Sequence, residues 1–193
     1  MVKIAPAGQT EIIEMLQKAE SAKSAKNYRS AIQICEKILA KDLDCAEAYE
    51  ELADNLISLR QPRKAEKALR RALLIAPNSG KAHYLLGVVK SGLKQWLFAA
   101  HSLEKANQFI SNNAEILRHL GWSIFHSGSE AEGLAVLERA RNLDPTNEAI
   151  LTDLGLCYLE LGDSQKSATV FQSILRYNPT NQKIRKYLAT LKE

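Results

Sequence analysis

The segment that decides the fold is Glu148–Asn181, EAILTDLGLCYLELGDSQKSATVFQSILRYNPTN. Two of its features return at a fixed distance along the chain. Its final Asn-Pro-Thr-Asn has a counterpart in Asp-Pro-Thr-Asn, and the two prolines, Pro145 and Pro179, lie 34 residues apart. A Leu-Gly pair recurs at the same 34-residue interval, with its glycines at Gly87, Gly121 and Gly155. This period accommodates two helices and their turns, so the sequence predicts a tandem helical repeat.

Placing proline at position 32 of each repeat divides the chain into units without any insertion. The five units are 12–45, 46–79, 80–113, 114–147 and 148–181. Small residues then occupy positions 8 and 20, where close crossing of the paired helices requires them. They are Ala19, Ala53, Gly87, Gly121 and Gly155 at position 8, and Ala31, Ala65, Ala99, Gly133 and Ser167 at position 20. With larger side chains at position 24, such as Phe171, the pattern resembles the tetratricopeptide-repeat (TPR) family.

That resemblance implies an all-α fold, a right-handed α-solenoid or TPR superhelix made of antiparallel helix pairs. We expect a single TPR domain over residues 12–193, preceded by a flexible tail over residues 1–11. The last residues, 182–193, carry an apolar stripe at the spacing of one helix face, made of Ile184, Tyr187, Leu188 and Leu191. We therefore predict a capping helix over 182–193 that covers the last repeat.

Composition limits the class of protein. The chain has 193 residues, a formal net charge of +4, 46% hydrophobic residues and 25% charged residues, which is typical of a folded globular protein. No apolar run of about 18 residues predicts a membrane span, and the N-terminus does not read as a secretory signal. The cysteines, Cys35, Cys45 and Cys157, fit neither a zinc-binding nor a redox spacing. These observations predict reduced thiols and a cytoplasmic location.

The TPR resemblance places a partner-binding groove on the concave side of the solenoid, which the first helix of each pair lines. The groove residues that it implies are Glu47, Glu50, Glu51, Asp54, Lys81, Tyr84, Val88, Arg118, His119, Trp122, Phe125 and Leu156. We hypothesise that a partner segment packs apolar side chains on Tyr84 and Trp122 and places a basic residue on the carboxylates. Two alternatives stay open: the aromatic residues pack between helices, and the carboxylates form an ordinary solvated surface.

No motif for catalysis or metal binding is found in the sequence. His119 and His126 lie about 10.5 Å apart along a helix, too far to hold one metal ion, and we expect both to be exposed and neutral. There is no glycine-rich phosphate loop and no nucleophile motif, so we expect neither a cofactor nor an enzyme. A basic run over residues 60–71 lacks interleaved aromatic residues, which does not favour nucleic acid as a partner.

The predicted function is that of a non-enzymatic adaptor or scaffold that binds a partner peptide or protein segment in its groove. Two alternatives are a small cytosolic TPR chaperone of a type III-like secretion system and a scaffold that self-associates through its repeat ends. Chaperone-binding members of the family hold a C-terminal carboxylate with a set of lysines, asparagines and an arginine. Only Lys81 matches that set here, so a co-chaperone of the heat-shock type is not expected.

Overall fold

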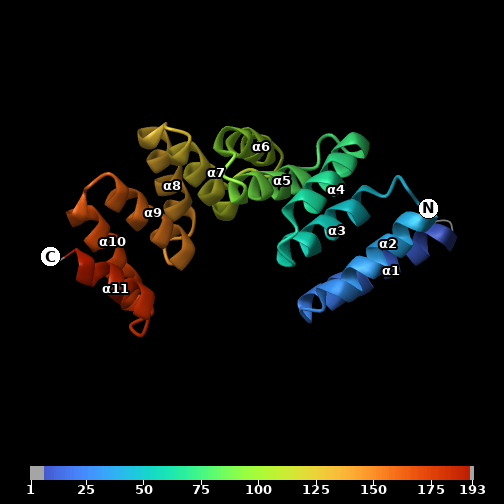
Figure 1. Ribbon diagram of the computed structural model, residues 1–193, viewed down its shortest axis with the longest axis horizontal. Helices are drawn as coiled ribbons and strands as arrows, with labels where there is room; N and C mark the ends of the chain where they lie inside the picture. The colour runs from blue at the N-terminus through green and yellow to red at the C-terminus, as the bar shows by residue number, and fades with distance from the viewer. Residues whose placement is uncertain (1–6, 192–193) are drawn as a thin grey trace, which may run out of the picture. The chain divides into compact units, whose positions relative to one another are not determined.

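The computed structural model describes residues 7–191, and this part of the chain is helical with no strand (Figure 1). Its helices are α1 (Ala7–Ser24), α2 (Tyr28–Lys41), α3 (Ala46–Ser58), α4 (Pro62–Ile75), α5 (Gly80–Gly92), α6 (Trp96–Phe109), α7 (Ala114–His126), α8 (Glu130–Leu143), α9 (Glu148–Glu160), α10 (Ser164–Tyr177) and α11 (Gln182–Thr190). The eleven helices within these residues fit five pairs followed by one C-terminal helix. The predicted all-α helical-repeat fold is confirmed.

The starts of the helix pairs follow the 34-residue frame. Helices α3, α5, α7 and α9 begin at the first residues of the second to fifth predicted units. The Pro-Thr-Asn sequences explain two of these starts, because their asparagines cap the following helices. Asn147 accepts a hydrogen bond from the backbone N–H of Ile150 (3.3 Å), and Asn181 accepts one from that of Ile184 (3.0 Å). Each bond satisfies a backbone donor that the first turn of a helix leaves unpaired.

The first helix begins earlier than predicted. A flexible tail is expected over residues 1–11, but α1 starts at Ala7, so residues 7–11 are helical and that part of the prediction is wrong. The physical reason is that no helix breaker follows Gly8, and Glu11 of α1 pairs with Lys41 of α2 at 2.5 Å. The remaining residues, 1–6 and 192–193, lie outside the described part of the chain.

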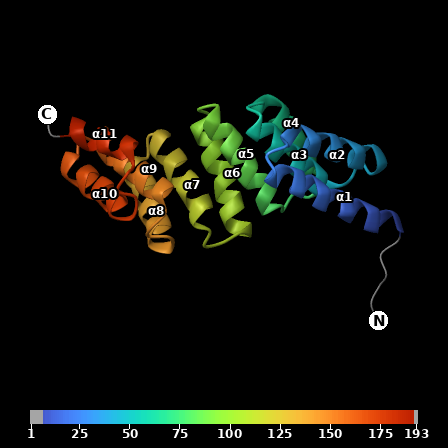
Figure 2. The same ribbon diagram turned by 90° about the horizontal axis from the view of Figure 1, so that it is seen from below.

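The chain divides into two compact units, and the boundary between them falls between Lys94 and Gln95. Unit 1 contains α1–α5, where α1 packs beside α2, and α3 packs against both α2 and α4 (Figures 1 and 2). Unit 2 contains α6–α11, and each of these helices packs against the next one in sequence. Packing between sequence neighbours is typical of repeat arrays. A single domain over residues 12–193 stays a prediction.

The small residues at positions 8 and 20 lie where paired helices cross. A Cβ atom on Gly133 of α8 would stand 2.5 Å from the backbone nitrogen of Phe125 and 2.7 Å from the carbonyl oxygen of Gly121 on α7. In the next pair, the Ser167 hydroxyl donates a buried hydrogen bond of 2.8 Å to the carbonyl oxygen of Gly155. In unit 1 the corresponding alanines are fully buried, namely Ala19, Ala31, Ala53 and Ala65. Backbones therefore approach closely where the sequence predicts small side chains.

The turn inside each helix pair contains a residue in the left-handed region, always at position 15 of the repeat. These residues are Lys26 (φ 58°), Arg60 (φ 57°), Lys94 (φ 57°), Gly128 (φ 101°) and Gly162 (φ 76°). Only glycine adopts this conformation without cost, so the three turns with lysine or arginine store some backbone strain.

The C-terminal helix α11 packs on α10. Its Ile184 is 1% exposed, and the ring of Tyr187 stacks on Phe171 with centroids 5.2 Å apart. The apolar stripe predicted for a capping helix therefore covers the last helix pair over the described residues.

Candidate functional site

The first helices of unit 1 surround a hollow of about 250 Å³, which we call the inner hollow. Its lining residues are Ile13, Leu16, Gln17 and Glu20 of α1, Glu47, Glu50 and Glu51 of α3, and Lys81 of α5. All of them occupy first-helix positions of successive pairs. The structure therefore brings together four of the predicted groove residues, those on α3 and α5, and adds an apolar wall from α1.

The carboxylates of α3 are largely neutralised by lysines from neighbouring helices. The ammonium nitrogen of Lys23 lies 2.9 Å from both Glu51 Oε2 and Asp54 Oδ2, and Lys81 Nζ lies 2.5 Å from Glu51 Oε1. Glu50 accepts a hydrogen bond of 2.5 Å from the Ser79 hydroxyl. The like charges on α3 therefore do not stand alone, and the prediction of an ordinary solvated acidic surface fails for Glu50 and Glu51, which are 6% and 8% exposed.

This network shifts the ionisation of its members. Burial alone would raise the pKa of Glu51, but the ammonium groups of Lys81 and Lys23 outweigh burial and hold that pKa below its ordinary value. Burial would likewise lower the pKa of Lys23, whereas its bonds to Glu51 and Asp54 raise it. Both residues therefore stay charged at neutral pH, and the pairs persist.

Two carboxylates at the inner hollow lie outside this ion-pair network. Glu20 and Glu47 are exposed and form no ion pair with any described residue. Neither Glu20 nor Lys23 belongs to the predicted groove set, although both occupy groove-facing positions of the first repeat, 9 and 12, on α1.

Tyr84 and Val88 lie on α5 and are half-buried. The Tyr84 ring packs against the buried cluster of unit 1, which includes Ala53 and Leu85. The alternative that this aromatic residue packs between helices therefore holds for much of its surface.

In unit 2, Arg118 of α7 forms the centre of an ion-pair network. Its guanidinium group lies 2.6 Å from Asp153 Oδ2 of α9 and 2.6 Å from Glu115 Oε1. His119 Nε2 lies 2.7 Å from Arg118 Nη2 and 3.2 Å from Glu115 Oε1. The bonds from His119 and Arg118 hold the pKa of Glu115 well below its usual range, whereas burial raises the pKa of Asp153 in spite of Arg118.

The aromatic residues of unit 2 surround His126. Its ring centroid lies 4.2 Å from that of Trp122, 4.9 Å from Trp96 and 5.3 Å from Phe125. The side chains of His126 and His119 are each 19% exposed, so the expectation of exposed histidines is wrong. Rings from α6 and α7 pack around the imidazole of His126, and the ion pairs of α7 enclose His119.

Phe125 is part of the core and does not line the groove, contrary to the prediction. It is 4% exposed, because its backbone faces Gly133 of α8 and its ring is drawn into the core of the pair. Trp122 and Leu156, in contrast, remain half-buried on α7 and α9. The structure thus leaves Arg118, His119, Trp122 and Leu156 as the partly accessible members of the predicted set in unit 2.

Among residues 7–191, no group of three or more His, Cys, Asp or Glu side chains is placed to hold a metal ion. The same residues include no helix long and apolar enough to cross a membrane.

Comparisons with known proteins agree with this architecture. The family model of the tetratricopeptide repeat matches residues 22–88 and 125–191, more than half of the sequence. The chain belongs to the TPR family. The TPR assignment rests on that model and on the helix pairs, since no curated protein matches the sequence. TPR proteins are in general scaffolds for protein–protein interaction, and protein or peptide partners follow from membership.

Solved structures share the fold at low sequence identity. PilF of Pseudomonas aeruginosa superposes with a TM-score of 0.81 at 14% identity, over 96% of this chain and 90% of PilF. MamA from Desulfovibrio magneticus RS-1 gives a TM-score of 0.79 at 17% identity, over 93% of this chain and 99% of MamA. YrrB, described as a TPR protein with an unusual peptide-binding site, gives 0.74 at 20% identity, over 98% of this chain and all of YrrB. At such identities the likeness concerns the fold alone.

Proposed function

We propose that this TPR protein is a non-enzymatic adaptor that binds a partner segment on the first-helix surface, with the inner hollow of unit 1 as its main contact. The observation that carries the proposal is the convergence of three first helices on one hollow. Ile13 and Leu16 supply apolar surface there, and Glu20 and Glu47 supply unpaired negative charge. The fitting occupant is a segment that presents an apolar side chain next to a lysine or arginine.

The ion pairs of α3 indicate which carboxylates are available to a basic residue of the partner. A basic residue of the partner meets Glu20 and Glu47, because Glu51 and Asp54 already hold Lys23 and Lys81. YrrB, with its unusual peptide-binding site, supports the view that this fold can present such a surface. In unit 2 the half-buried ring of Trp122 is proposed as a contact of its own, independent of the inner hollow. The secretion-chaperone and self-assembly alternatives stay predictions.

The test is affinity capture from the source cell with paired charge-reversal variants. Glu20→Lys with Glu47→Lys removes both unpaired carboxylates of the inner hollow. Glu104→Lys with Glu130→Lys is the matched control, because these two are also exposed and Glu130, like Glu47, lies in the first turn of its helix. A partner retained by the wild type and the control but lost by the first variant supports the proposal. Equal retention by all three proteins would remove it.

A further inference from the structure

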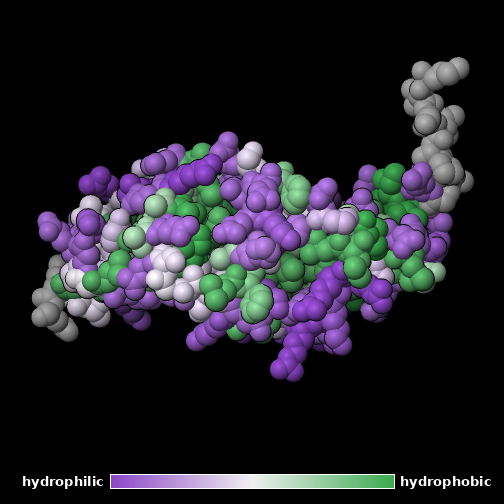
Figure 3. All heavy atoms as spheres, turned by 90° about the horizontal axis from the view of Figure 1, so that it is seen from above, coloured by the Kyte–Doolittle hydropathy of each residue, from purple (hydrophilic) through white to green (hydrophobic). Residues whose placement is uncertain are grey.

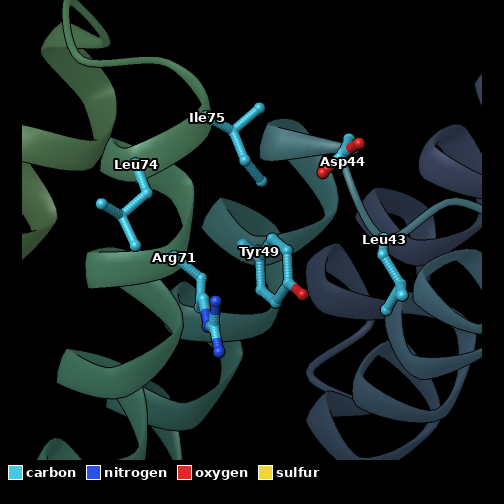
Figure 4. A pocket seen from close by; sticks show the side chains of 6 residues that line it. All are labelled: Leu43, Asp44, Tyr49, Arg71, Leu74 and Ile75. Atoms are coloured by element: carbon cyan, nitrogen blue, oxygen red, sulfur yellow. The ribbon is translucent and has the colours of Figure 1, made fainter.

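The opposite side of α3 in unit 1 carries a second recessed surface, separate from the inner hollow. Two hollows lie along it, one of about 430 Å³ beside the start of α4 and one of about 490 Å³ beside its end. The first is bordered by Ile32 of α2, by Leu52 and Leu56 of α3, by Leu59 directly after α3, and by Gln61 and Lys64. The second contains Tyr49 of α3, with Leu74 of α4 on one side and Leu43 on the other (Figure 4). We call the whole surface the outer groove.

The floor of the outer groove is a single apolar stripe. Tyr49, Leu52, Leu56 and Leu59 follow one another at intervals of three and four residues, which places them on one face of α3. Their rise spans about 15 Å at 1.5 Å per residue, or nearly three helical turns. At the rim, Leu43 and Leu74 are 70% and 73% exposed, which is unusual for side chains of this size. Figure 3 likewise shows hydrophobic surface over unit 1, in the right half of the view, bordered by hydrophilic side chains.

The walls of the outer groove carry an excess of positive charge. Arg29 of α2 and Lys64 and Arg71 of α4 line the hollows, and Lys67 lies between the last two on the same face of α4, at spacings of three and four residues; all four are exposed. None of them forms an ion pair with another described residue. The one acidic residue of α4, Glu66, is already held by Arg70 at 2.6 Å and by Lys90 at 2.9 Å. The acids that border the hollows are Glu36 and Asp44 alone.

We propose that the outer groove is a docking surface for an acidic amphipathic helix of a partner protein. A helix that lies over α3 packs its apolar face on the half-buried Tyr49 and Leu52 and on the exposed Leu74, since a helical ridge fits the groove between neighbouring helices. Carboxylates on its flanks then meet Lys64 and Arg71 in a partly desolvated setting. The aliphatic floor favours a protein over a nucleic acid, because it offers one aromatic ring and no stacking series for bases.

The probe for this proposal is a fluorescein-labelled synthetic peptide of about 18 residues, with leucine at every third or fourth position and glutamate on the remaining helix face. Its controls are a scrambled peptide of the same composition and a labelled single-stranded oligonucleotide. Fluorescence anisotropy at low and high salt measures the affinity of each for the full chain. The helical peptide is expected to bind at least about tenfold more tightly than the scrambled one, and more weakly as salt rises.

Charge-reversal variants locate the peptide. Lys64→Glu with Arg71→Glu is expected to weaken binding at least about tenfold. Lys18→Glu with Arg176→Glu is the matched control, since it also reverses one exposed lysine and one exposed arginine without breaking an ion pair. Equal losses in both variants would overturn the proposal, as would equal affinity for the scrambled peptide or no binding of the helical peptide at low salt. Tighter binding of the oligonucleotide, with the same loss in the first variant, would assign the surface to nucleic acid instead.

A labelling experiment provides a second readout at the groove itself. All three native cysteines are buried, so a thiol introduced by Leu74→Cys can be labelled selectively with an environment-sensitive dye. The dye is expected to report peptide binding at the same concentrations as anisotropy does. The control is Tyr177→Cys on α10, a position that is 63% exposed. A response from the control site and none from the site on α4 contradicts docking in the outer groove.

Discussion

Gly133→Ala tests the physical basis of the fold with the smallest available change. The added methyl group would stand 2.5–2.7 Å from backbone atoms of Phe125 and Gly121 on α7, about 0.7–0.9 Å closer than the roughly 3.4 Å at which ordinary contact begins. These are backbone atoms, so no side chain can rotate away and the two helices must separate. Overpacking of this kind costs about 1–3 kcal/mol, and the absence of a flexible neighbour favours the upper end. The better helix propensity of alanine offsets about 1 kcal/mol of this cost, so the free energy of unfolding is expected to fall by about 2 kcal/mol.

The measurement is urea unfolding followed by tryptophan fluorescence. Both tryptophans, Trp96 and Trp122, lie in unit 2 with Gly133, so the signal reports the altered unit. Gly92→Ala is the matched control, because no heavy atom lies within 4 Å of its added Cβ and the substitution lies at the end of helix α5. Its unfolding free energy, followed by circular dichroism, is expected to stay the same or to rise slightly. A Gly133→Ala protein as stable as the wild type would refute the close-crossing argument.

Three further changes test other parts of the structure. Arg60→Gly is expected to raise the unfolding free energy by about 0.5–1 kcal/mol, because it relieves the left-handed conformation at φ 57°; urea titration would detect this. Arg118→Ala leaves Asp153 buried without its cation, so a loss of about 2–4 kcal/mol is expected, with partial recovery when Asp153→Asn is added; no recovery would contradict the pair. Burial raises the pKa of Cys35 and of Cys157 to about 12 from 9.0. Since the unfolded chain loses these protons first, the contribution of the two thiols to stability is constant below about pH 9 and falls toward pH 12, by up to about 1.4 kcal/mol per thiol and pH unit. Unfolding at pH 8 and pH 10 under reducing conditions, repeated with Cys157→Ala, measures this slope.

The features of this TPR protein that the sequence predicted well are those set by the size of one side chain at one repeat position. Gly121 and Gly133 lie at a crossing because any larger residue would hold the helices apart, and this requirement can be read without coordinates. Asn147 and Asn181 mark helix starts for the same kind of reason, since a capping side chain acts within three residues of itself.

The features that the sequence did not reveal depend on how the side chains of one repeat meet those of the next. The acidic character expected for α3 overlooked Lys23, whose long side chain reaches from α1 to Glu51 and Asp54. Phe125 was assigned to the groove because the family frame treats position 12 alike in every repeat. In the fourth pair, however, Gly133 allows the backbone of Phe125 to approach α8 so closely that its ring becomes core. Such outcomes depend on relative helix positions, which a repeat pattern does not specify.

Helix α3 separates two surfaces of opposite charge, and this arrangement leads to a final prediction. One face carries Glu47, Glu50 and Glu51 toward the inner hollow, and the other carries the apolar floor of the outer groove, which is bordered by Lys64 and Arg71. The two proposed ligands therefore have opposite charge and share no contact residue. Each charge reversal, at Glu20 and Glu47 or at Lys64 and Arg71, should therefore change the binding free energy of its own ligand by the same amount with or without the other reversal, within about 0.5 kcal/mol. Isothermal titration of each ligand into the separate and combined variants measures these changes. A larger departure would mean that α3 transmits a change of position from one surface to the other, because no direct contact joins the two sets of side chains.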